Sequence, residues 1–95
     1  MSAYIIAQVN ITNKEQYEQY KIKASPLVEK FRGKFLVRGG KFEKLLGNWD
    51  YERTVIIEFP SYEQALKWYD SEEYRLVRKI REKNSLGNVI IIKGE

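Results

Sequence analysis

The chain has 95 residues and a net charge of +4, which fits one domain with a modest hydrophobic core. It contains no cysteine and no histidine, which excludes thiol nucleophiles, thiolate or imidazole metal ligands and the commonest general base. We therefore expect no metal and no cofactor, and the mild basic excess is too small by itself to indicate nucleic-acid binding.

We expect no signal peptide at the start of this sequence. The amino-terminal residues carry no positive region, and their apolar run is too short for a signal peptide. No apolar run approaches the length that spans a membrane. We expect a cytoplasmic protein without membrane contact.

The first part of the chain reads as strand, helix, strand. Residues from Ala3 to Ile11 are largely β-branched or aromatic, which predicts a strand. Thr12 and Glu15 fit a capping box, so a helix should begin there and end with Gly33 in the left-handed conformation. Residues from Lys34 to Arg38 then predict the second strand.

The middle of the chain is a strand signal interrupted by glycines. Gly39 and Gly40 predict a bulge or a sharp bend, and the alternative is a close approach of the backbone to a ligand. Residues 41–46 predict a short extended segment, and residues 47–48 predict a turn. The strongest strand signal follows at residues 52–59.

The last part predicts two helical segments and a strand. Ser61 and Gln64 form a second capping box. The apolar stripe of the helix that follows comprises Tyr62, Ala65, Leu66 and Tyr69. A break at residues 70–71 precedes a further helix to about Lys83 that buries Tyr74, Val77 and Ile80. Gly87 predicts a turn into a last strand at residues 89–93.

This element order defines the expected fold. Strand, helix, strand, strand, helix, strand is the split βαβ, or ferredoxin-like, arrangement. Right-handed crossovers place the first and third strands at the centre of an antiparallel sheet, with the helices on one face. We predict a single α+β domain over residues 1–95, a ferredoxin-like βαββαβ sandwich.

The face of the sheet that the helices leave open carries too many apolar residues for a surface in water. A monomer should show polar residues there, whereas the pattern gives isoleucine and leucine in several strands. We therefore predict a homodimer in which two sheets pack face to face around a two-fold axis. Scattered surface hydrophobic residues are the alternative. The residues concerned are Ile6, Leu36, Ile56, Ile90 and Ile92.

Four motifs over nearly the whole chain resemble the family called domain of unknown function 1330. They are Tyr4-Ile-Ile-Ala-Gln-Val, Gly33-Lys-Phe-Leu-Val-Arg-Gly-Gly, Gly47-Asn-Trp-Asp-Tyr-Glu-Arg-Thr-Val-Ile-Ile-Glu-Phe-Pro-Ser and Trp68-Tyr-Asp-Ser-Glu-Glu-Tyr. The resemblance implies the dimeric α/β barrel fold, with a cleft beside each sheet. Relatives in that superfamily include cofactor-independent monooxygenases, isomerases, haem-dependent enzymes and proteins without known activity. Glu72 stands where the family often has proline.

Arg38 and Glu58 are the candidate catalytic residues. Both fall on the partly polar faces of their strands, where an unpaired charge is costly, so we expect them to form an ion pair. In a functional site Arg38 would hold a carboxylate or enolate oxygen and Glu58 would act as the general base. The slightly favoured alternative is a structural pair that fixes the strand register.

Three further residues are candidates for ligand binding. Trp49 follows a turn and would cover a ligand cleft or pack against a partner chain. Arg53 could bind an anion or stack on Trp49. Trp68 lies off the apolar stripe of its helix, which makes it a candidate for the cleft or the interface.

Three functions compete at this point. The first is a small-molecule binder or cofactor-independent enzyme that takes a small anionic or aromatic ligand in the cleft. The second is a structural or accessory homodimer without activity. The third is an RNA-binding module, since the RNA-recognition fold has the same element order. The expected aromatic residues are missing from the open face, where the first strand offers Tyr4 alone, so RNA binding is the least favoured.

Overall fold

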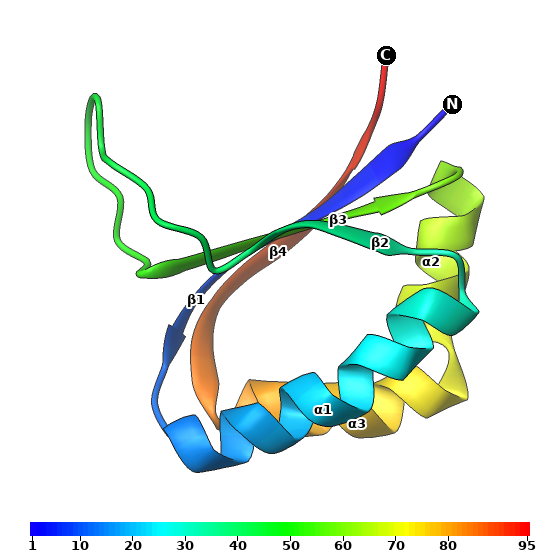
Figure 1. The fold of residues 1–95 in the computed structure, drawn as a ribbon, viewed down its shortest axis with the longest axis horizontal. Helices are drawn as coiled ribbons and strands as arrows, with labels where there is room; N and C mark the ends of the chain where they lie inside the picture. Colours follow the sequence, from blue (N-terminus) through cyan, green and yellow to red (C-terminus); the bar gives the residue numbers. More distant parts are fainter.

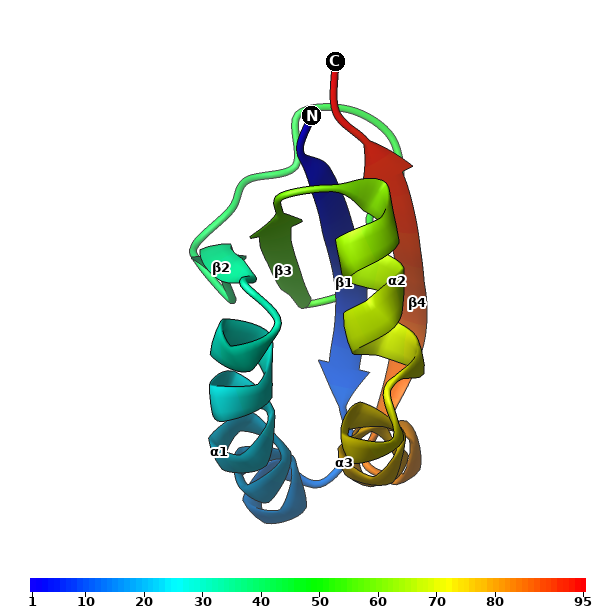
Figure 2. The same ribbon diagram turned by 90° about the vertical axis from the view of Figure 1, so that its right-hand side faces the viewer.

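The structure, a computed structural model, describes all 95 residues as a four-stranded antiparallel sheet with three helices on one of its faces (Figures 1 and 2). The strands run in the order β2-β3-β1-β4, so the first and third strands are central as predicted. The ferredoxin-like α+β fold is confirmed, with the second helical region divided in two. The elements are β1 (Ala3–Ile11), α1 (Lys14–Lys30), β2 (Lys34–Arg38), β3 (Arg53–Phe59), α2 (Tyr62–Asp70), α3 (Glu72–Lys83) and β4 (Ser85–Lys93). None of the helices is long and apolar enough to cross a membrane.

A bulge in β2 decides which side chains of that strand meet the helices. Phe35 pairs with Ile57 of β3, but Val37 pairs with Ile56, so Leu36 is the extra residue. After the bulge, Arg38 lies opposite Val55, whose side chain packs against the core. Arg38 is therefore moved to the helix-covered face, whereas uninterrupted alternation would have placed it on the open face.

The core lies between the sheet and the helices. Its largest fully buried side chains are Trp68, Tyr74, Phe59 and Val28. The stripe predicted for α2 is therefore wrong in phase, because α2 buries Ala65 and Trp68 while Tyr62 and Leu66 are exposed. Tyr74 is buried as predicted.

The helix starts follow local hydrogen bonding. Asn13 caps α1, since its side chain accepts a hydrogen bond from the backbone of Gln16 at 3.2 Å; the predicted cap, Thr12, is wrong by one residue. Ser61 caps α2 as predicted, with its Oγ 3.0 Å from the Gln64 backbone nitrogen. α1 remains a single helix in spite of Pro26.

α1 ends in a pair of hydrogen bonds that need one left-handed residue. The Arg32 amide donates to the Glu29 carbonyl at 3.0 Å, and the Gly33 amide donates to the Val28 carbonyl at 2.7 Å. The left-handed residue is Arg32, with φ of 69°, and not Gly33 as predicted. Gly33 is needed for space, because a Cβ there would come within 2.8 Å of the Phe59 ring.

β4 begins earlier than the predicted residue 89. It runs from Ser85, and Gly87 pairs with Val9 inside the strand instead of forming a turn. A Cβ at Gly87 would collide with the backbone oxygen of Gln8 in the neighbouring strand. Glycine is therefore required at this position because two backbones approach each other closely.

Residues 39–52 form a long connection, hereafter the arm, that rises on the side of the sheet away from the helices (Figure 1). The extended segment predicted at residues 41–46 is not part of the sheet. Asn10 fastens the end of the arm, because its Nδ2 donates to the Asp50 carbonyl at 3.0 Å and its Oδ1 accepts from the Glu52 amide at 2.7 Å.

The open face of the sheet carries the predicted apolar residues. Ile6 of β1 lies between Ile56 of β3 and Ile90 of β4 in one row of cross-strand neighbours. Ile90 and Ile92 are exposed, as is Leu36 in the bulge. We refer to this helix-free side of the four strands as the open face.

Candidate functional site

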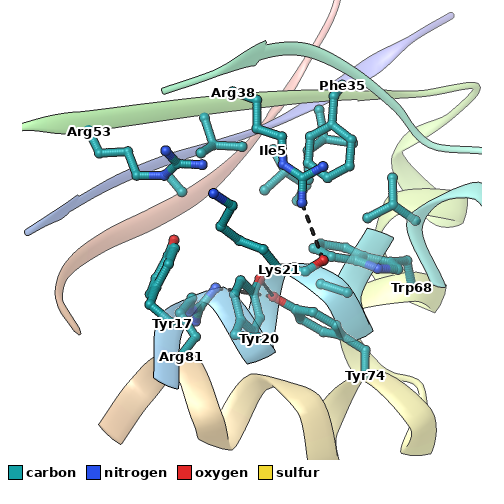
Figure 3. A pocket seen from close by; sticks show the side chains of 15 residues that line it. Ile5, Tyr17, Tyr20, Lys21, Phe35, Arg38, Arg53, Trp68, Tyr74 and Arg81 are labelled. Atoms are coloured by element: carbon teal, nitrogen blue, oxygen red, sulfur yellow. Dashed lines mark hydrogen bonds between the residues drawn. The ribbon is translucent and has the colours of Figure 1, made fainter. Parts of the chain in front are cut away.

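A cavity of about 30 Å³ lies between α1, α3 and the helix-covered face of the sheet (Figure 3). This space is enough for about two water molecules. Eleven of its fifteen lining residues are hydrophobic, and the other four are Lys21, Arg38, Arg53 and Arg81. An open groove of about 350 Å³ shares the first three of these cations and adds Glu18, Ile22 and Ser25. The cavity and the groove together form the candidate site, with the three shared cations at its mouth.

Arg38 lies at the mouth, between β2 and α1. Its Nη2 donates to the Ser25 Oγ at 2.7 Å and to the Lys21 carbonyl at 3.3 Å. Its guanidinium carbon lies 4.1 Å from the centre of the Phe35 ring, so aromatic stacking also orients the charge. None of these partners is a carboxylate, so Arg38 forms no salt bridge, although the Glu18 carboxylate lies close enough to interact with its charge.

Arg53 opens β3 and reaches the mouth from the other side. Its guanidinium lies 5.7 Å from the centre of the Tyr17 ring. Gly39 has φ of +73°, and a Cβ there would occupy the place of the Arg53 Nη1. The Nε of Arg53 is buried and has no hydrogen-bond acceptor. A buried donor without an acceptor costs free energy, so a ligand oxygen at this place would relieve the cost.

Lys21 is the only mouth cation with an acidic partner. Its Nζ lies 2.8 Å from the Glu18 carboxylate, and the hydrogen bond from Lys21 is the main cause that lowers the pKa of Glu18. Glu18 is exposed on the outer groove and does not line the cavity. No carboxylate lines the cavity itself.

The inner wall is built from buried phenols and one buried guanidinium. The hydroxyls of Tyr20 and Tyr74 lie 2.7 Å apart, and the Nη1 of Arg81 donates to the Tyr74 hydroxyl at 3.3 Å. Burial raises the pKa of both Tyr20 and Tyr74, so both phenols stay protonated near neutral pH. For Arg81, burial alone would lower the pKa, but the neighbouring tyrosines Tyr74 and Tyr20 outweigh it and the net shift is upward.

Trp68 completes the inner wall. It is only 2% exposed, and its ring packs against that of Tyr74 with the centroids 4.1 Å apart and the planes tilted by 31°. Its Nε1 is buried without a hydrogen-bond acceptor. Two residues that line the site, Trp68 and Arg53, therefore each have a buried nitrogen donor without an acceptor.

These residue types determine what the site can do. Four cationic side chains and neutral phenols supply hydrogen-bond donors and positive charge, while the apolar majority of the wall suits a hydrocarbon or aromatic body. No residue that lines the cavity is a carboxylate or a histidine, and the one carboxylate of the groove, Glu18, is hydrogen-bonded to Lys21. The site favours the binding and stabilisation of an organic anion over proton abstraction by the protein.

The structure separates the two residues predicted to be catalytic. Arg38 lies on the helix-covered face because of the bulge, while Glu58 lies on the open face, where it accepts a hydrogen bond from the Tyr4 hydroxyl at 3.3 Å. The predicted ion pair between Arg38 and Glu58 is therefore wrong. No structural observation tests a catalytic role for either residue, and each such role stays a prediction.

Of the predicted ligand-binding residues, Arg53 and Trp68 line the cavity together with Arg38. Trp49 does not, because it lies in the arm, where its ring is 6.4 Å from that of Phe42. The predicted stacking of Arg53 on Trp49 is replaced by the contact of Arg53 with Tyr17.

Several lining residues were not predicted from the sequence, and of these Lys21 and Arg81 carry charge. Lys21 lies four residues after Tyr17 and seven before Val28, on the buried side of α1. Arg81 lies seven residues after Tyr74 on the buried side of α3. Both residues could have been identified as lining residues because each is a cation within an otherwise apolar helical stripe.

The family model for the domain of unknown function DUF1330 matches residues 2–95. None of the curated proteins matches the chain. Among solved structures, a protein of unknown function from Rhodopseudomonas palustris (RPA0582) superposes with a TM-score of 0.79 at 20% identity, over 99% of this chain and 82% of that chain.

Two more distant structures share the fold. SnoaB from Streptomyces nogalater, a cofactor-independent oxygenase, has a TM-score of 0.65 at 6% identity, over 99% of this chain and 93% of that chain. A dimeric ferredoxin-like protein of unknown function from Thermobifida fusca has a TM-score of 0.56 at 14% identity, over 99% of this chain and 90% of that chain. At these identities the likeness concerns the fold alone.

Proposed function

The chain belongs to the DUF1330 family, and from that premise we propose that it binds a small aromatic or unsaturated organic anion in the cleft between α1 and the sheet. The observation that carries the proposal is the charge of the wall. Four cationic side chains line the cavity, and no carboxylate does. Glu18 offsets one of these charges through its salt bridge with Lys21, and a low-dielectric cavity with an excess of positive charge attracts an anion more strongly than the same charges in water would.

The geometry favours a carboxylate or phenolate oxygen at the mouth. Arg38 and Arg53 approach the mouth from β2 and β3, and Lys21 approaches from α1. A planar oxyanion matches the fork of a guanidinium, which explains the use of arginine at two of the three positions. Because the cavity has room for about two water molecules, the apolar body of the ligand would lie in the open groove at the mouth and would reach toward Trp68 only if the Lys21 side chain moves aside.

The chemistry that such a site could add is limited by its residues. A bound phenol or enol that ionises by itself would be held as its anion by the cations, without a base from the protein. This is the state from which cofactor-independent oxygenation of a substrate starts, and SnoaB, which has the same fold, is described as such an oxygenase. We therefore propose that the protein binds the anion, and oxygenation of an electron-rich anion is the activity to assay.

We place the site in a homodimer whose two open faces pack against each other. The apolar row of Ile6, Ile56 and Ile90 supports this arrangement, as does the description of the Thermobifida fusca relative as dimeric. The cleft and the open face lie on opposite sides of the sheet, so the dimer leaves the mouth of the cleft accessible.

A thermal-shift titration with benzoate tests the binding proposal, and benzamide is the matched neutral compound. A ligand whose free concentration is a hundred times its dissociation constant adds about 2.7 kcal/mol to the free energy of unfolding. This should raise the melting temperature of a domain this small by roughly 10 °C. The shift should be absent with benzamide and should be lost in Arg53→Gln. The exposed Arg75→Gln variant, which removes the same charge from α3, should keep it.

A panel of phenolates and other carboxylates extends the test beyond benzoate. If none of these anions stabilises the protein more than its neutral counterpart, the binding proposal is wrong. The structural homodimer without a ligand would then be the better account.

A further inference from the structure

Arg81 carries a buried positive charge at the inner wall of the cavity. The residue is only 9% exposed, and its Nη1 donates to the Tyr74 hydroxyl at 3.3 Å. A protonated phenol does not neutralise a guanidinium, and none of the three salt bridges of the structure involves Arg81. Burying a charge without a partner of opposite sign is costly. An anion beside Arg81 would therefore stabilise the folded chain.

The two phenols beside Arg81 have one proton that no acceptor takes up. The hydroxyls of Tyr20 and Tyr74 lie 2.7 Å apart, so one of their two protons forms the hydrogen bond between them. The only other hydrogen bond of this pair is the one that Tyr74 accepts from Arg81. Because burial raises the pKa of both phenols, both protons are present near neutral pH. The pair therefore has a free O–H donor next to the buried guanidinium.

The rest of the polar wall adds donors and no negative charge. Figure 3 shows the Tyr17 hydroxyl and the Lys21 ammonium directed into the space that Arg81 also lines. Lys21 has three N–H donors, of which one is used in its hydrogen bond to Glu18. Glu18 lines the outer groove and not the cavity. The inner end of the cavity is therefore rich in donors and carries a positive charge without a counter-ion.

The size of the cavity selects a small anion. Its volume of about 30 Å³ has room for about two water molecules, which excludes a ring or a carbon chain. Water is the competing occupant, but each water must also donate two hydrogen bonds. The side-chain oxygens of the wall are all tyrosine hydroxyls, and two of these three are already hydrogen-bonded to each other. A monatomic anion needs no acceptor and supplies the missing negative charge.

We propose that the inner end of the cavity, between Tyr20, Tyr74 and Arg81, binds a small monovalent inorganic anion of the size of chloride. The charge of Arg81 and the free phenolic proton would hold this anion. The site is separate from the mouth, where Arg38 and Arg53 lie. It does not rest on the function proposed above, because Arg81 and the two phenols are not needed to hold an organic anion in the outer groove.

A chloride titration of the melting temperature tests the proposal, with chloride replacing methanesulfonate so that the ionic strength stays constant. Methanesulfonate carries the same charge but is too large for a cavity of about 30 Å³. Constant ionic strength keeps the screening of surface charges equal throughout the titration. The melting temperature of the wild type should rise with chloride and reach a plateau. A flat titration would overturn the proposal.

Arg81→Gln removes the charge of the proposed site, and Arg75→Gln is the matched control. Arg75 lies on the same helix, α3, with its side chain exposed. The loss of a charged hydrogen-bond donor should raise the chloride concentration at the midpoint of the titration at least about tenfold in Arg81→Gln. The midpoint should be unchanged in Arg75→Gln. Equal midpoints in the two variants would overturn the assignment to Arg81.

Crystals of the wild type grown in sodium bromide locate the anion even if Arg81→Gln does not fold. The anomalous scattering of bromide should give a peak between the hydroxyls of Tyr20 and Tyr74 and the guanidinium of Arg81. A peak only at Arg38 and Arg53, or water alone in the cavity, would overturn the proposal. Bromide in the cavity without a chloride response in solution would be an adventitious ion only and would overturn it as well.

Neither experiment uses a carboxylate or a phenolate. A failure of benzoate binding would therefore contradict the proposed function and leave the chloride and bromide results unaffected. A flat chloride titration, in turn, would leave the benzoate-induced shift and its loss in Arg53→Gln as they stand.

Discussion

Gly39→Ala is the substitution that connects the backbone of the arm to the candidate site. Gly39 has φ of +73°, a left-handed conformation that costs an L-residue about 1–2 kcal/mol. The added Cβ would also take the place of the Arg53 Nη1, so the guanidinium must leave its position 5.7 Å from the Tyr17 ring. We expect the free energy of unfolding in urea to fall by about 1–2 kcal/mol, and the benzoate-induced thermal shift to be lost.

Gly40→Ala is the matched control for this substitution. Gly40 has no positive φ, and the nearest atom to an added Cβ is the Val37 Cγ1 at 4.0 Å. Alanine should be neutral there or stabilise by less than about 1 kcal/mol through the unfolded state. If Gly39→Ala unfolds at the same urea concentration as Gly40→Ala, the backbone argument fails. If Gly39→Ala is destabilised but binds benzoate like the wild type, Arg53 is not needed for the anion.

Three more predictions concern the fold and the inner wall. Asn13→Ala should lower the free energy of unfolding in urea by about 1 kcal/mol, because Asn13 caps α1. Thr12→Ala should lower it by much less, and equal losses for the two variants would contradict this cap. Gly87→Ala should cost at least about 2 kcal/mol, since the Cβ meets a backbone oxygen of β1 that cannot move away, and an unchanged melting temperature would refute this register. Burial raises the pKa values of Tyr20 and Tyr74, so the unfolded chain releases these phenolic protons at lower pH than the folded chain does. The free energy of unfolding of the wild type should therefore fall above pH ~10, and it should fall less in the double variant Tyr20→Phe/Tyr74→Phe. Parallel pH profiles of the two proteins would disprove this assignment.

The sequence predicts most of the fold because the strand and helix periods are clear. The β-branched runs locate β1 and β3, and the central place of both follows from the order of elements. The errors lie where one residue decides the outcome. Asn13 rather than Thr12 caps α1, and Arg32 rather than Gly33 is left-handed, since both neighbours in each pair fit the local pattern.

The site was harder to predict because one bulge reverses the face of a strand. Alternation alone puts Arg38 with Glu58, but the extra residue Leu36 turns Arg38 toward the helices. A bulge depends on hydrogen bonds with the neighbouring strand, and no residue type in β2 indicates it. The face of Arg53 could be predicted from the period of two, since β3 pairs with β1 in a regular register.

Trp68 shows a different limit. Its position off the predicted stripe suggested the cleft or the interface, and it does line the cavity, but it does so from inside the core. The phase of a nine-residue helix is poorly determined by its own residues, because its contacts with α3 and the sheet select the buried side.

Nuclear magnetic resonance of the side-chain nitrogens during a benzoate titration tests the central claim most directly. The Arg53 Nε and the Trp68 Nε1 are buried donors without acceptors in the candidate site, and Trp49 lies in the arm outside it. The account predicts that the Arg53 and Trp68 signals shift with one common dissociation constant, while the Trp49 indole signal stays in place. A titration that moves only Trp49, or that moves none of the three, would contradict an anion site between α1 and the sheet.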